Sequence, residues 1–141
     1  MSDNAAENRD RFETPLTEAQ VHAMNSLALA HVGDAVFDLL ARLYICGRHG
    51  GARADLHRDT VTLVNAGAQA VDARRLLPLL TEEEAEVYRR GRNAKVNSVP
   101  RHAGLGEYHA ATGLEALFGW LYLLGRRERL SALFARIVEE D

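Results

Sequence analysis

Two acidic residues of this chain lie in segments that are otherwise mostly apolar. Asp34 lies within the run LALAHVGDAVFDLL, and Glu115 lies within ATGLEALFGWLYLL. An ionised carboxylate in apolar surroundings costs free energy unless a cation or several hydrogen-bond donors compensate it. Carboxylates from two packed helices supply the oxygen ligands that Mg²⁺ and Mn²⁺ prefer, and such a metal ion can activate water against a phosphodiester. The two acids are therefore the candidate metal ligands and catalytic residues.

Each acid also has a purely structural interpretation. Thr112 and Glu115 have the spacing of a capping box, in which the glutamate would only satisfy the N-terminus of a helix. Asp34 could instead pair with Arg42 or with another arginine, because buried acids usually have a partner. Spacing alone does not show whether the two segments meet, so both interpretations stay open at this point.

A second candidate feature is a basic segment in the middle of the chain. Between positions 87 and 106 there are five cations and no acid, namely Arg89, Arg90, Arg92, Lys95 and Arg101. Cations on one segment can contact the phosphates of a nucleic-acid duplex, and Asn93 can hydrogen-bond a phosphate or a ribose 2′-hydroxyl. The alternative is a solvated loop that neutralises the acidic run at positions 82–86.

The total charge hides this basic segment. The 141 residues carry a formal net charge of −3, which by itself argues against a nucleic-acid partner. Residues 1–20 contain five acids and two arginines, and the last three residues are all acidic. Residues 21–138 therefore hold 15 basic and 12 acidic groups. The acidic excess lies at the two ends, and the middle is compatible with RNA as a partner.

Other classes of protein are disfavoured by the rest of the sequence. Cys46 is the single cysteine, which excludes an internal disulfide, fits a reducing, cytoplasmic compartment, and is expected to be a buried small residue. The six histidines include no pair spaced for a zinc site. The acidic N-terminus is not a secretory signal, and no apolar run is long enough to cross a membrane.

The periodicity of apolar residues predicts an all-α protein, a compact bundle of five to six helices with no strand. Residues 1–13 are expected to be a flexible acidic leader, and residues 14–141 a single domain. A first helix is expected to begin at Thr14-Pro15. The strongest helical signal spans 25–47 and has an apolar stripe of Leu29, Val32, Val36, Leu39 and Leu43. The other expected helices span 55–77, 81–91, 107–124 and 127–139, with a basic loop at 92–106.

Five segments of the sequence carry a resemblance to a known family. They are LALAHVGDAVFDLLARLY at 27–44, LHR at 56–58, LTEEE at 80–84, RGRNAK at 90–95 and TGLEALFGWLYL at 112–123. Together they resemble Mini-ribonuclease III, the short bacterial branch of the ribonuclease III family, which lacks a separate domain for binding double-stranded RNA. The resemblance covers roughly residues 25–137.

This resemblance implies an all-helical homodimer, with a ribonuclease III-like catalytic domain, that cuts double-stranded RNA with Mg²⁺, for which Mn²⁺ can substitute. The implied substrate is the precursor of the large-subunit (23S) ribosomal RNA, cut to leave 5′-phosphate and 3′-hydroxyl ends after attack by metal-activated water. By motif, Asp34 and Glu115 take the places of two catalytic, metal-binding acids of the family. Arg92, Asn93, Lys95 and Arg101 are expected to bind the RNA, with Arg89, Arg58 and His102 as secondary candidates.

The sequence departs from full-length ribonuclease III at two acidic positions. Ala30 and Thr112 stand where the longer enzymes carry carboxylates. Fewer carboxylates weaken metal binding, and they leave open whether one or two metal ions bind. Asp38, one helical turn after Asp34, could assist through water or could be a surface acid.

Two other functions remain as alternatives. The reduced carboxylate set is compatible with a non-catalytic module that binds double-stranded RNA or takes part in assembly. The pair Glu83 and Glu86 has the spacing expected of an all-α nucleotide pyrophosphatase, although the pair also fits a solvated helix start.

Overall fold

The structure is a computed structural model that describes residues 10–49, 55–94 and 104–139. These residues form seven α-helices and one short 3₁₀ helix, without a strand among them, so the all-α prediction is confirmed. The helices are α2 (Glu18–His22), α3 (Ser26–Arg48), α4 (Leu56–Val64), α5 (Ala66–Leu76), η1 (Leu77–Leu79), α6 (Glu82–Arg92), α7 (Leu105–Leu123) and α8 (Arg127–Val138).

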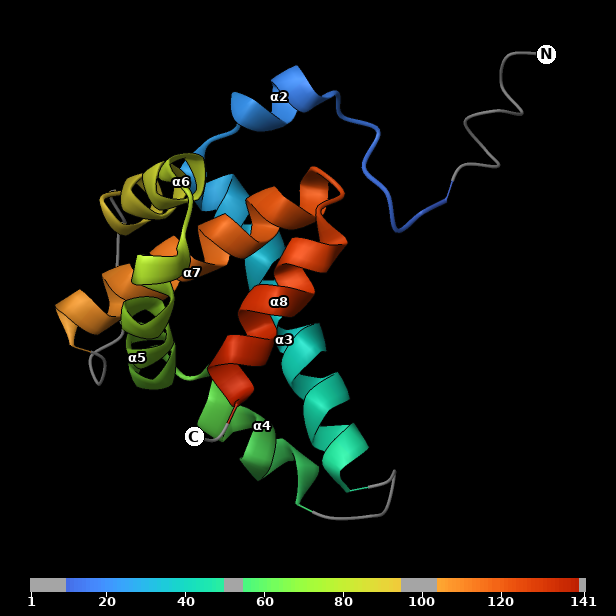
Figure 1. Ribbon diagram of the computed structural model, residues 1–141, viewed down its shortest axis with the longest axis vertical. Coiled ribbons are helices and arrows are strands. Elements are labelled where there is room, and N and C mark those ends of the chain that lie inside the picture. Colours follow the sequence, from blue (N-terminus) through green and yellow to red (C-terminus); the bar gives the residue numbers. More distant parts are fainter. Residues whose placement is uncertain (1–9, 50–54, 95–103, 140–141) are drawn as a thin grey trace.

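Helix α7 lies at the centre of the molecule, where it crosses α3 (Figure 1). Almost every residue of α7 from Ala111 to Leu121 is buried, and the largest buried side chains include Trp120 and Phe118. Phe37 of α3 packs against Phe118 with ring centroids 5.3 Å apart. Helices α5 and α6 pack against α7, and α8 contacts both α5 and α7. Burial of these apolar side chains is the main stabilising contribution to the bundle.

The helix that follows Pro15 begins later than the sequence suggested. The Thr17 side chain accepts a hydrogen bond from the backbone N–H of Gln20, whose side chain accepts one from the backbone N–H of Thr17. This reciprocal capping box starts α2 at Glu18, so the predicted start at Thr14-Pro15 is wrong. The predicted capping box of Thr81 and Glu84 is present at the start of α6.

The single helix predicted at 55–77 is in fact two helices. Asn65 has an extended backbone conformation and is both the C-cap of α4 and the N-cap of α5. Its amide donates to the carbonyl of Val61, while its side-chain oxygen accepts from the N–H of Ala68. One side chain therefore satisfies backbone groups of both helices, which makes the break favourable without a proline or glycine at that position.

Gly91 does not end α6, contrary to the prediction. The helix continues to Arg92 with Asn93 as its C-cap, and Gly91 is buried against α7. A Cβ on Gly91 would lie 2.9 Å from the Cα of Gly113. The glycine is thus needed for close packing of α6 on α7 rather than for a turn.

The buried face of α3 is not the stripe of large residues expected from the sequence. Its buried residues are Leu29, Ala30, Gly33, Phe37, Ala41 and Ile45, which recur at helical spacing. Of the predicted stripe only Leu29 is buried, whereas Leu39 is 53% and Leu43 is 61% exposed, so the C-terminal part of the stripe faces outward. Small residues occupy the buried face because α7 lies very close to it. Cys46 is also exposed, which corrects the expectation that it is buried.

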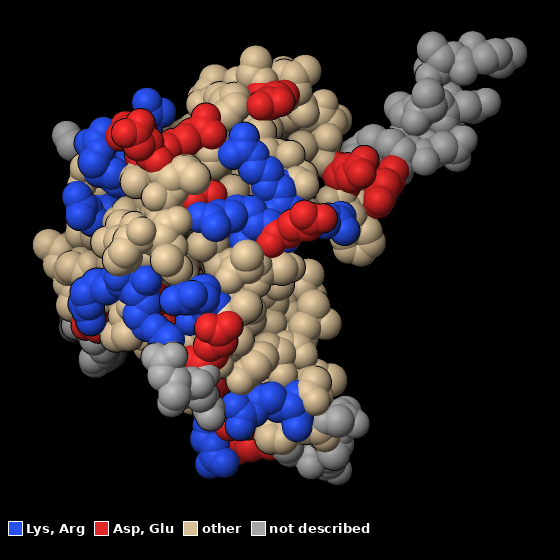
Figure 2. All heavy atoms as spheres, in the orientation of Figure 1, with Lys and Arg blue, Asp and Glu red and all other residues tan. Residues whose placement is uncertain are grey.

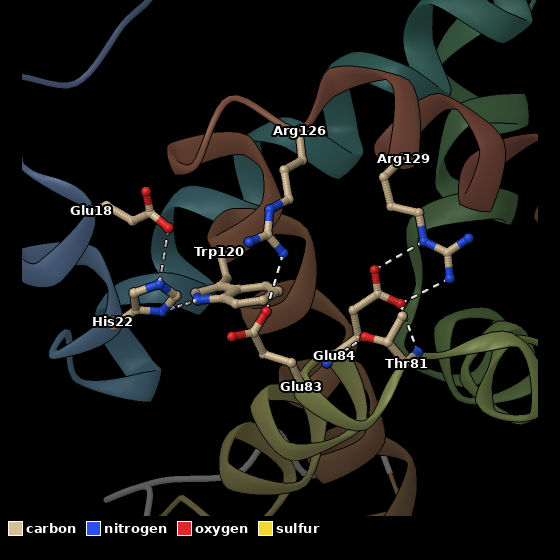
Figure 3. A network of polar contacts seen from close by, with 8 residues as sticks. All are labelled: Glu18, His22, Thr81, Glu83, Glu84, Trp120, Arg126 and Arg129. Atoms are coloured by element: carbon tan, nitrogen blue, oxygen red, sulfur yellow. Dashed lines mark hydrogen bonds and ion pairs between the residues drawn. The ribbon is translucent and has the colours of Figure 1, made fainter.

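Polar contacts tie α2, α6, α7 and the start of α8 together on one side of the bundle (Figure 3). Arg129 donates two hydrogen bonds to the Glu84 carboxylate, at 2.8 and 2.9 Å. Arg126 pairs with Glu83 at 3.3 Å and lies over the ring of Trp120. Within the described parts of the chain, none of the helices combines the length and apolar character needed to cross a bilayer.

Candidate active site

The two candidate acids meet at the crossing of α3 and α7. Asp34 directly follows Gly33, and Glu115 lies one helical turn before Gly119. A Cβ on Gly33 would overlap the carbonyl oxygen of Glu115, and a Cβ on Gly119 would overlap that of Leu29. The two backbones therefore touch at this point, which only glycine permits. The side chains that flank the glycines are brought together as a consequence.

The carboxyl groups of Asp34 and Glu115 lie close enough together that Asp34 acts on the pKa of Glu115. Burial and the neighbouring Asp34 carboxylate raise the pKa of Glu115 from its ordinary 4.5 to about 8, while a hydrogen bond from Gln69 opposes this rise. Glu115 is partly buried in the site, whereas Asp34 faces solvent. Two acids held this close repel each other when both are ionised, and a bound cation would relieve the repulsion.

The structure contradicts the capping-box interpretation of Glu115 and the pairing of Asp34 with Arg42. Thr112 lies inside α7, and its hydroxyl donates to the carbonyl of Tyr108 at 3.0 Å, so it does not cap the helix together with Glu115. Arg42 pairs with Asp38 at 2.8 Å and not with Asp34. Asp38 is thereby a partly exposed acid with an arginine partner, rather than a third free carboxylate beside the site.

The donor set fits a single hard cation with an incomplete protein shell. Among residues 10–49, 55–94 and 104–139, no group of three or more His, Cys, Asp or Glu side chains is arranged to hold a metal ion. Ala30 and Thr112, the two positions without carboxylates, are both buried close to the crossing. Mg²⁺ is commonly bound by one or two carboxylates together with water and substrate phosphate, so the Asp34–Glu115 pair suits it.

Two buried polar residues of α5 were missed from the sequence, and one of them, Gln69, lies beside the site. Gln69 is 3% exposed and Asp72 is 7% exposed, and both lie on the face of α5 that is buried in the bundle. The signal was available, because Gln69, Asp72, Ala73 and Leu76 form one stripe at helical spacing. Val71, an apolar residue of the predicted 55–77 helix, is by contrast 46% exposed.

A hollow of about 570 Å³ opens beside Glu115, between the first turns of α5 and α7. Asn65, Gln69, Glu107 and Tyr108 are among the residues that line it. The carboxyl of Glu107 lies close to Gly67, so the first turn of α5 can accommodate no larger residue there without displacing it. The site is therefore reached from this side by a recess with polar walls.

The described part of the basic segment is exposed at the end of α6. Arg92 and Asn93 are exposed, and Arg92 lies over the ring of Tyr88. Arg89 and Arg90 both pair with Glu86, at 2.6 and 3.2 Å. Figure 2 shows acidic and basic side chains next to each other over this part of the surface. Lys95, Arg101 and His102 lie outside the described residues.

A second recess, of about 480 Å³, lies between the start of α3 and the end of α6. The polar residues along it are Asn25, Ser26, Arg89, Arg90 and Asn93. The secondary candidate Arg58 is far along the chain in α4, where it pairs with Asp55 at 3.3 Å. The structure thus places Arg92, Asn93, Arg89 and Arg90 at the end of one helix and leaves Arg58 apart from them in the fold.

The pair that suggested a pyrophosphatase is engaged in other contacts. Glu83 pairs with Arg126, and Glu86 pairs with Arg89 and Arg90. Each carboxylate of this pair has an arginine partner on the surface of α6, as expected for the solvated start of a helix.

A family model and a solved structure identify the class of protein to which the chain belongs. A family model described as the Ribonuclease III domain matches residues 27–126, a range that includes both Asp34 and Glu115. A crystal structure of a Fusobacterium nucleatum protein superposes with a TM-score of 0.74 and 29% identity, covering 84% of this chain and 94% of that one.

Curated relatives then identify the branch of that family. A Mini-ribonuclease 3 from Thermoanaerobacter sp. is 42% identical, with 89% of this chain and 90% of the relative covered. A Mini-ribonuclease 3 from Symbiobacterium thermophilum is 45% identical, with 86% and 88% covered. The chain belongs to the ribonuclease III family, in its Mini-ribonuclease 3 branch. It is therefore an endoribonuclease of the type that acts on double-stranded RNA, an activity generally dependent on divalent metal.

Proposed function

We propose that the chain hydrolyses double-stranded RNA at the Asp34–Glu115 pair with Mg²⁺ as cofactor, and that Mn²⁺ can substitute for it. The observation that carries the proposal is the proximity of two carboxyl groups at a backbone crossing, without an arginine or lysine of the described residues shown paired to either. When bound there, Mg²⁺ supplies a Lewis acid that activates water and polarises the scissile phosphate. The products are 5′-phosphate and 3′-hydroxyl ends.

The two acids have different tasks in this proposal. Asp34 faces solvent and presents its carboxylate to the cation and to the approaching RNA strand. Glu115 is partly buried and fixed by its neighbours, so it sets the position of the cation relative to the protein. Glu115 must lose its proton when the cation binds, because a carboxylate is the ligand form.

RNA binding is assigned to the basic segment that begins at the end of α6. Arg92 and Asn93 are exposed there, and Lys95 and Arg101 follow in the sequence. These residues would contact phosphates, which orient a duplex without selecting its sequence. As substrate we propose the precursor of large-subunit (23S) ribosomal RNA in the cytoplasm, a choice supported by the family to which the chain belongs.

We also propose a homodimer, in which each subunit cuts one strand of the duplex. The outward stripe of α3 supports this, since Leu39 and Leu43 are large, apolar and more than half exposed. A hollow of about 760 Å³ with mostly apolar walls, lined among others by Val32, Ala35 and Leu130, extends this surface toward α8. Exposed apolar patches of this kind mark interaction sites.

The proposal is tested by incubating the purified protein with a long RNA duplex, with and without Mg²⁺, and mapping the ends of the products. The Asp34→Asn and Glu115→Gln variants are expected to lose at least about 100-fold in cleavage rate while keeping their helical circular-dichroism spectrum, as metal-ligand losses do. Asp38→Asn is the matched control on α3 and should cleave normally. Cleavage by both site variants at the wild-type rate would refute the site.

The homodimer is tested separately by analytical ultracentrifugation. Leu39→Lys places a charge in the outward stripe and should convert a dimer to monomers. Arg136→Glu, on an exposed position of α8, is the control and should leave the mass unchanged. A wild-type protein that sediments as a monomer at micromolar concentration would contradict the proposed assembly.

A further inference from the structure

Helix α5 directs an amide side chain into the bundle at the level of the active site. Gln69 is 3% exposed and lies in the first turns of α5, whose start is fixed by the Asn65 cap. Helix α5 packs along α7, so the buried face of α5 meets the helix that carries Glu115. A buried amide is costly without hydrogen-bond partners, so its contacts are informative.

The Gln69 side chain lies beside Glu115, because both residues line the same hollow between the first turns of α5 and α7, and Gln69 acts to lower the pKa of that acid. The other polar side chain next to Glu115 on α7 is unavailable, because the Thr112 hydroxyl donates to the carbonyl of Tyr108. Gln69 is therefore the neutral polar side chain beside Glu115 on the side of α5, while Asp34 lies on the side of α3. An amide suits this place because it holds a carboxylate in one orientation without adding charge or competing for the cation.

We propose that Gln69 is a positioning residue, whose buried amide donates a hydrogen bond to the Glu115 carboxylate and so orients it for cation binding. The inference rests on the function proposed above, in which Glu115 binds Mg²⁺. Groups that hydrogen-bond metal ligands typically change metal affinity or activity by about 10- to 100-fold when they are removed. With only two carboxylates at the site, the orientation of Glu115 depends all the more on this neutral donor.

Gln69→Met is the main test, because methionine matches the length and flexibility of glutamine and lacks the donor. With Mn²⁺ as the probe, direct titration followed by electron paramagnetic resonance should show a dissociation constant raised about tenfold. The rate constant kcat for duplex cleavage should fall, and the Mg²⁺ concentration for half-maximal activity should rise. The dissociation constant for RNA measured without divalent metal should be unchanged, since Gln69 is only 3% exposed.

Asp72→Asn is the matched control, because Asp72 is buried one turn further along α5 and, unlike Gln69, does not act on the pKa of Glu115. This variant should bind Mn²⁺ as the wild type does. A double-mutant cycle adds a readout that does not need an active enzyme: Gln69→Met should have no further effect on Mn²⁺ binding once Glu115 is replaced by Gln. If Gln69→Met reduces the melting temperature by more than about 10 °C, well beyond a loss of 1 kcal/mol, Gln69→Leu replaces it in the same titrations.

Three outcomes overturn the inference. Unchanged Mn²⁺ affinity and unchanged kcat would show that Gln69 only fills space. An equal loss of Mn²⁺ affinity in the Glu115→Gln background would show that it does not act through Glu115. Weaker RNA binding without metal would assign it to the RNA instead. If Glu115→Gln itself cleaves normally, the proposed function fails; if Glu115→Gln is inactive and Gln69→Met is normal, only the role of Gln69 fails.

Discussion

Gly33 and Gly119 face each other where α3 crosses α7, and neither position has room for a Cβ. A Cβ on Gly33 would lie 2.8 Å from the amide nitrogen of Gly119, and a Cβ on Gly119 would lie 2.9 Å from that of Gly33. The neighbouring atoms belong to the backbone, so they cannot move aside as the end of a flexible side chain would. This contact sets the separation of Asp34 and Glu115.

Alanine at Gly33 or Gly119 is expected to force the two helices apart. Each substitution should lower the free energy of unfolding by about 3 kcal/mol or more, at the upper end of overpacking effects, and should abolish cleavage. Gly47→Ala, in the same helix as Gly33, is the control, because a Cβ there meets nothing within 4 Å. It should be neutral or stabilising by up to about 1 kcal/mol. Urea unfolding measures all three; equal stabilities would contradict the close crossing.

The active-site pair should destabilise the metal-free protein at high pH. Burial and the neighbouring Asp34 raise the pKa of Glu115 from 4.5 to about 8. The folded protein therefore binds this proton more tightly than the unfolded chain does. Stability that is present below pH 4.5 is lost as the pH rises to about 8.

Glu115→Gln removes this loss, because the amide carries no charge at any of these pH values. In buffer with a metal chelator, the variant should be more stable than the wild type by roughly 2–4 kcal/mol at about pH 8 and should show no such advantage at about pH 4.5. Thermal unfolding across this pH range measures the difference. If the difference in stability between the variant and the wild type is the same at both pH values, the raised pKa of Glu115 is contradicted.

Asp72 provides an independent pH effect away from the active site. One of its carboxylate oxygens is buried without a hydrogen-bond partner in the described structure, and burial raises its pKa from 3.8 to about 6, against the attraction of Arg75. Stability is therefore lost between pH 3.8 and 6. Asp72→Asn should gain about 1–3 kcal/mol over the wild type at about pH 7 and nothing at about pH 3.5. Urea midpoints at the two pH values measure this difference. An Asp72→Asn variant that is less stable than the wild type at the higher pH would contradict the prediction.

The Arg129–Glu84 pair is the strongest ion pair of the polar network in Figure 3. Glu84 is 3% exposed and accepts two hydrogen bonds from Arg129, so removing the arginine leaves a buried carboxylate without its cation. Arg129→Met should lower the free energy of unfolding by about 3 kcal/mol. Arg136→Met, which breaks the exposed pair with Glu139 at 3.7 Å, is the control and should stay within about 0.5 kcal/mol. Similar losses in both variants would refute the special role of burial.

The basic segment after α6 should determine how RNA affinity depends on salt. Lys95→Ala combined with Arg101→Ala is expected to weaken binding of an RNA duplex. The slope of log affinity against log salt should fall by about one for each phosphate that the variant no longer binds. Fluorescence anisotropy with a labelled duplex, without Mg²⁺, measures this slope over roughly 50–300 mM salt. Arg136→Ala should leave the slope unchanged; an unchanged slope in the double variant would exclude the segment.

Local signals in the sequence predicted much of the fold. The Thr81–Glu84 capping box and the apolar periodicity of 25–47 and 107–124 each depend on residues within a few turns, and the structure has helices at these places. The same kind of signal was incomplete at Asn65, where a side chain that caps two helices at once separates α4 from α5. Gly91 was wrongly predicted to end its helix. The glycine is required by a close contact with α7, which lies further along the chain and leaves no local signal.

The sequence by itself determined the helical class, the two acids and the family resemblance, because composition, periodicity and motifs are properties of the chain alone. The tertiary structure decided which face of α3 is buried, that Asp34 and Glu115 touch, and that Gln69 lies beside them. These features depend on how closely two helices approach, and that distance is set by Gly33 and Gly119 meeting across 86 positions of sequence. No local pattern specifies such a contact, since each glycine is required only by the presence of the other helix.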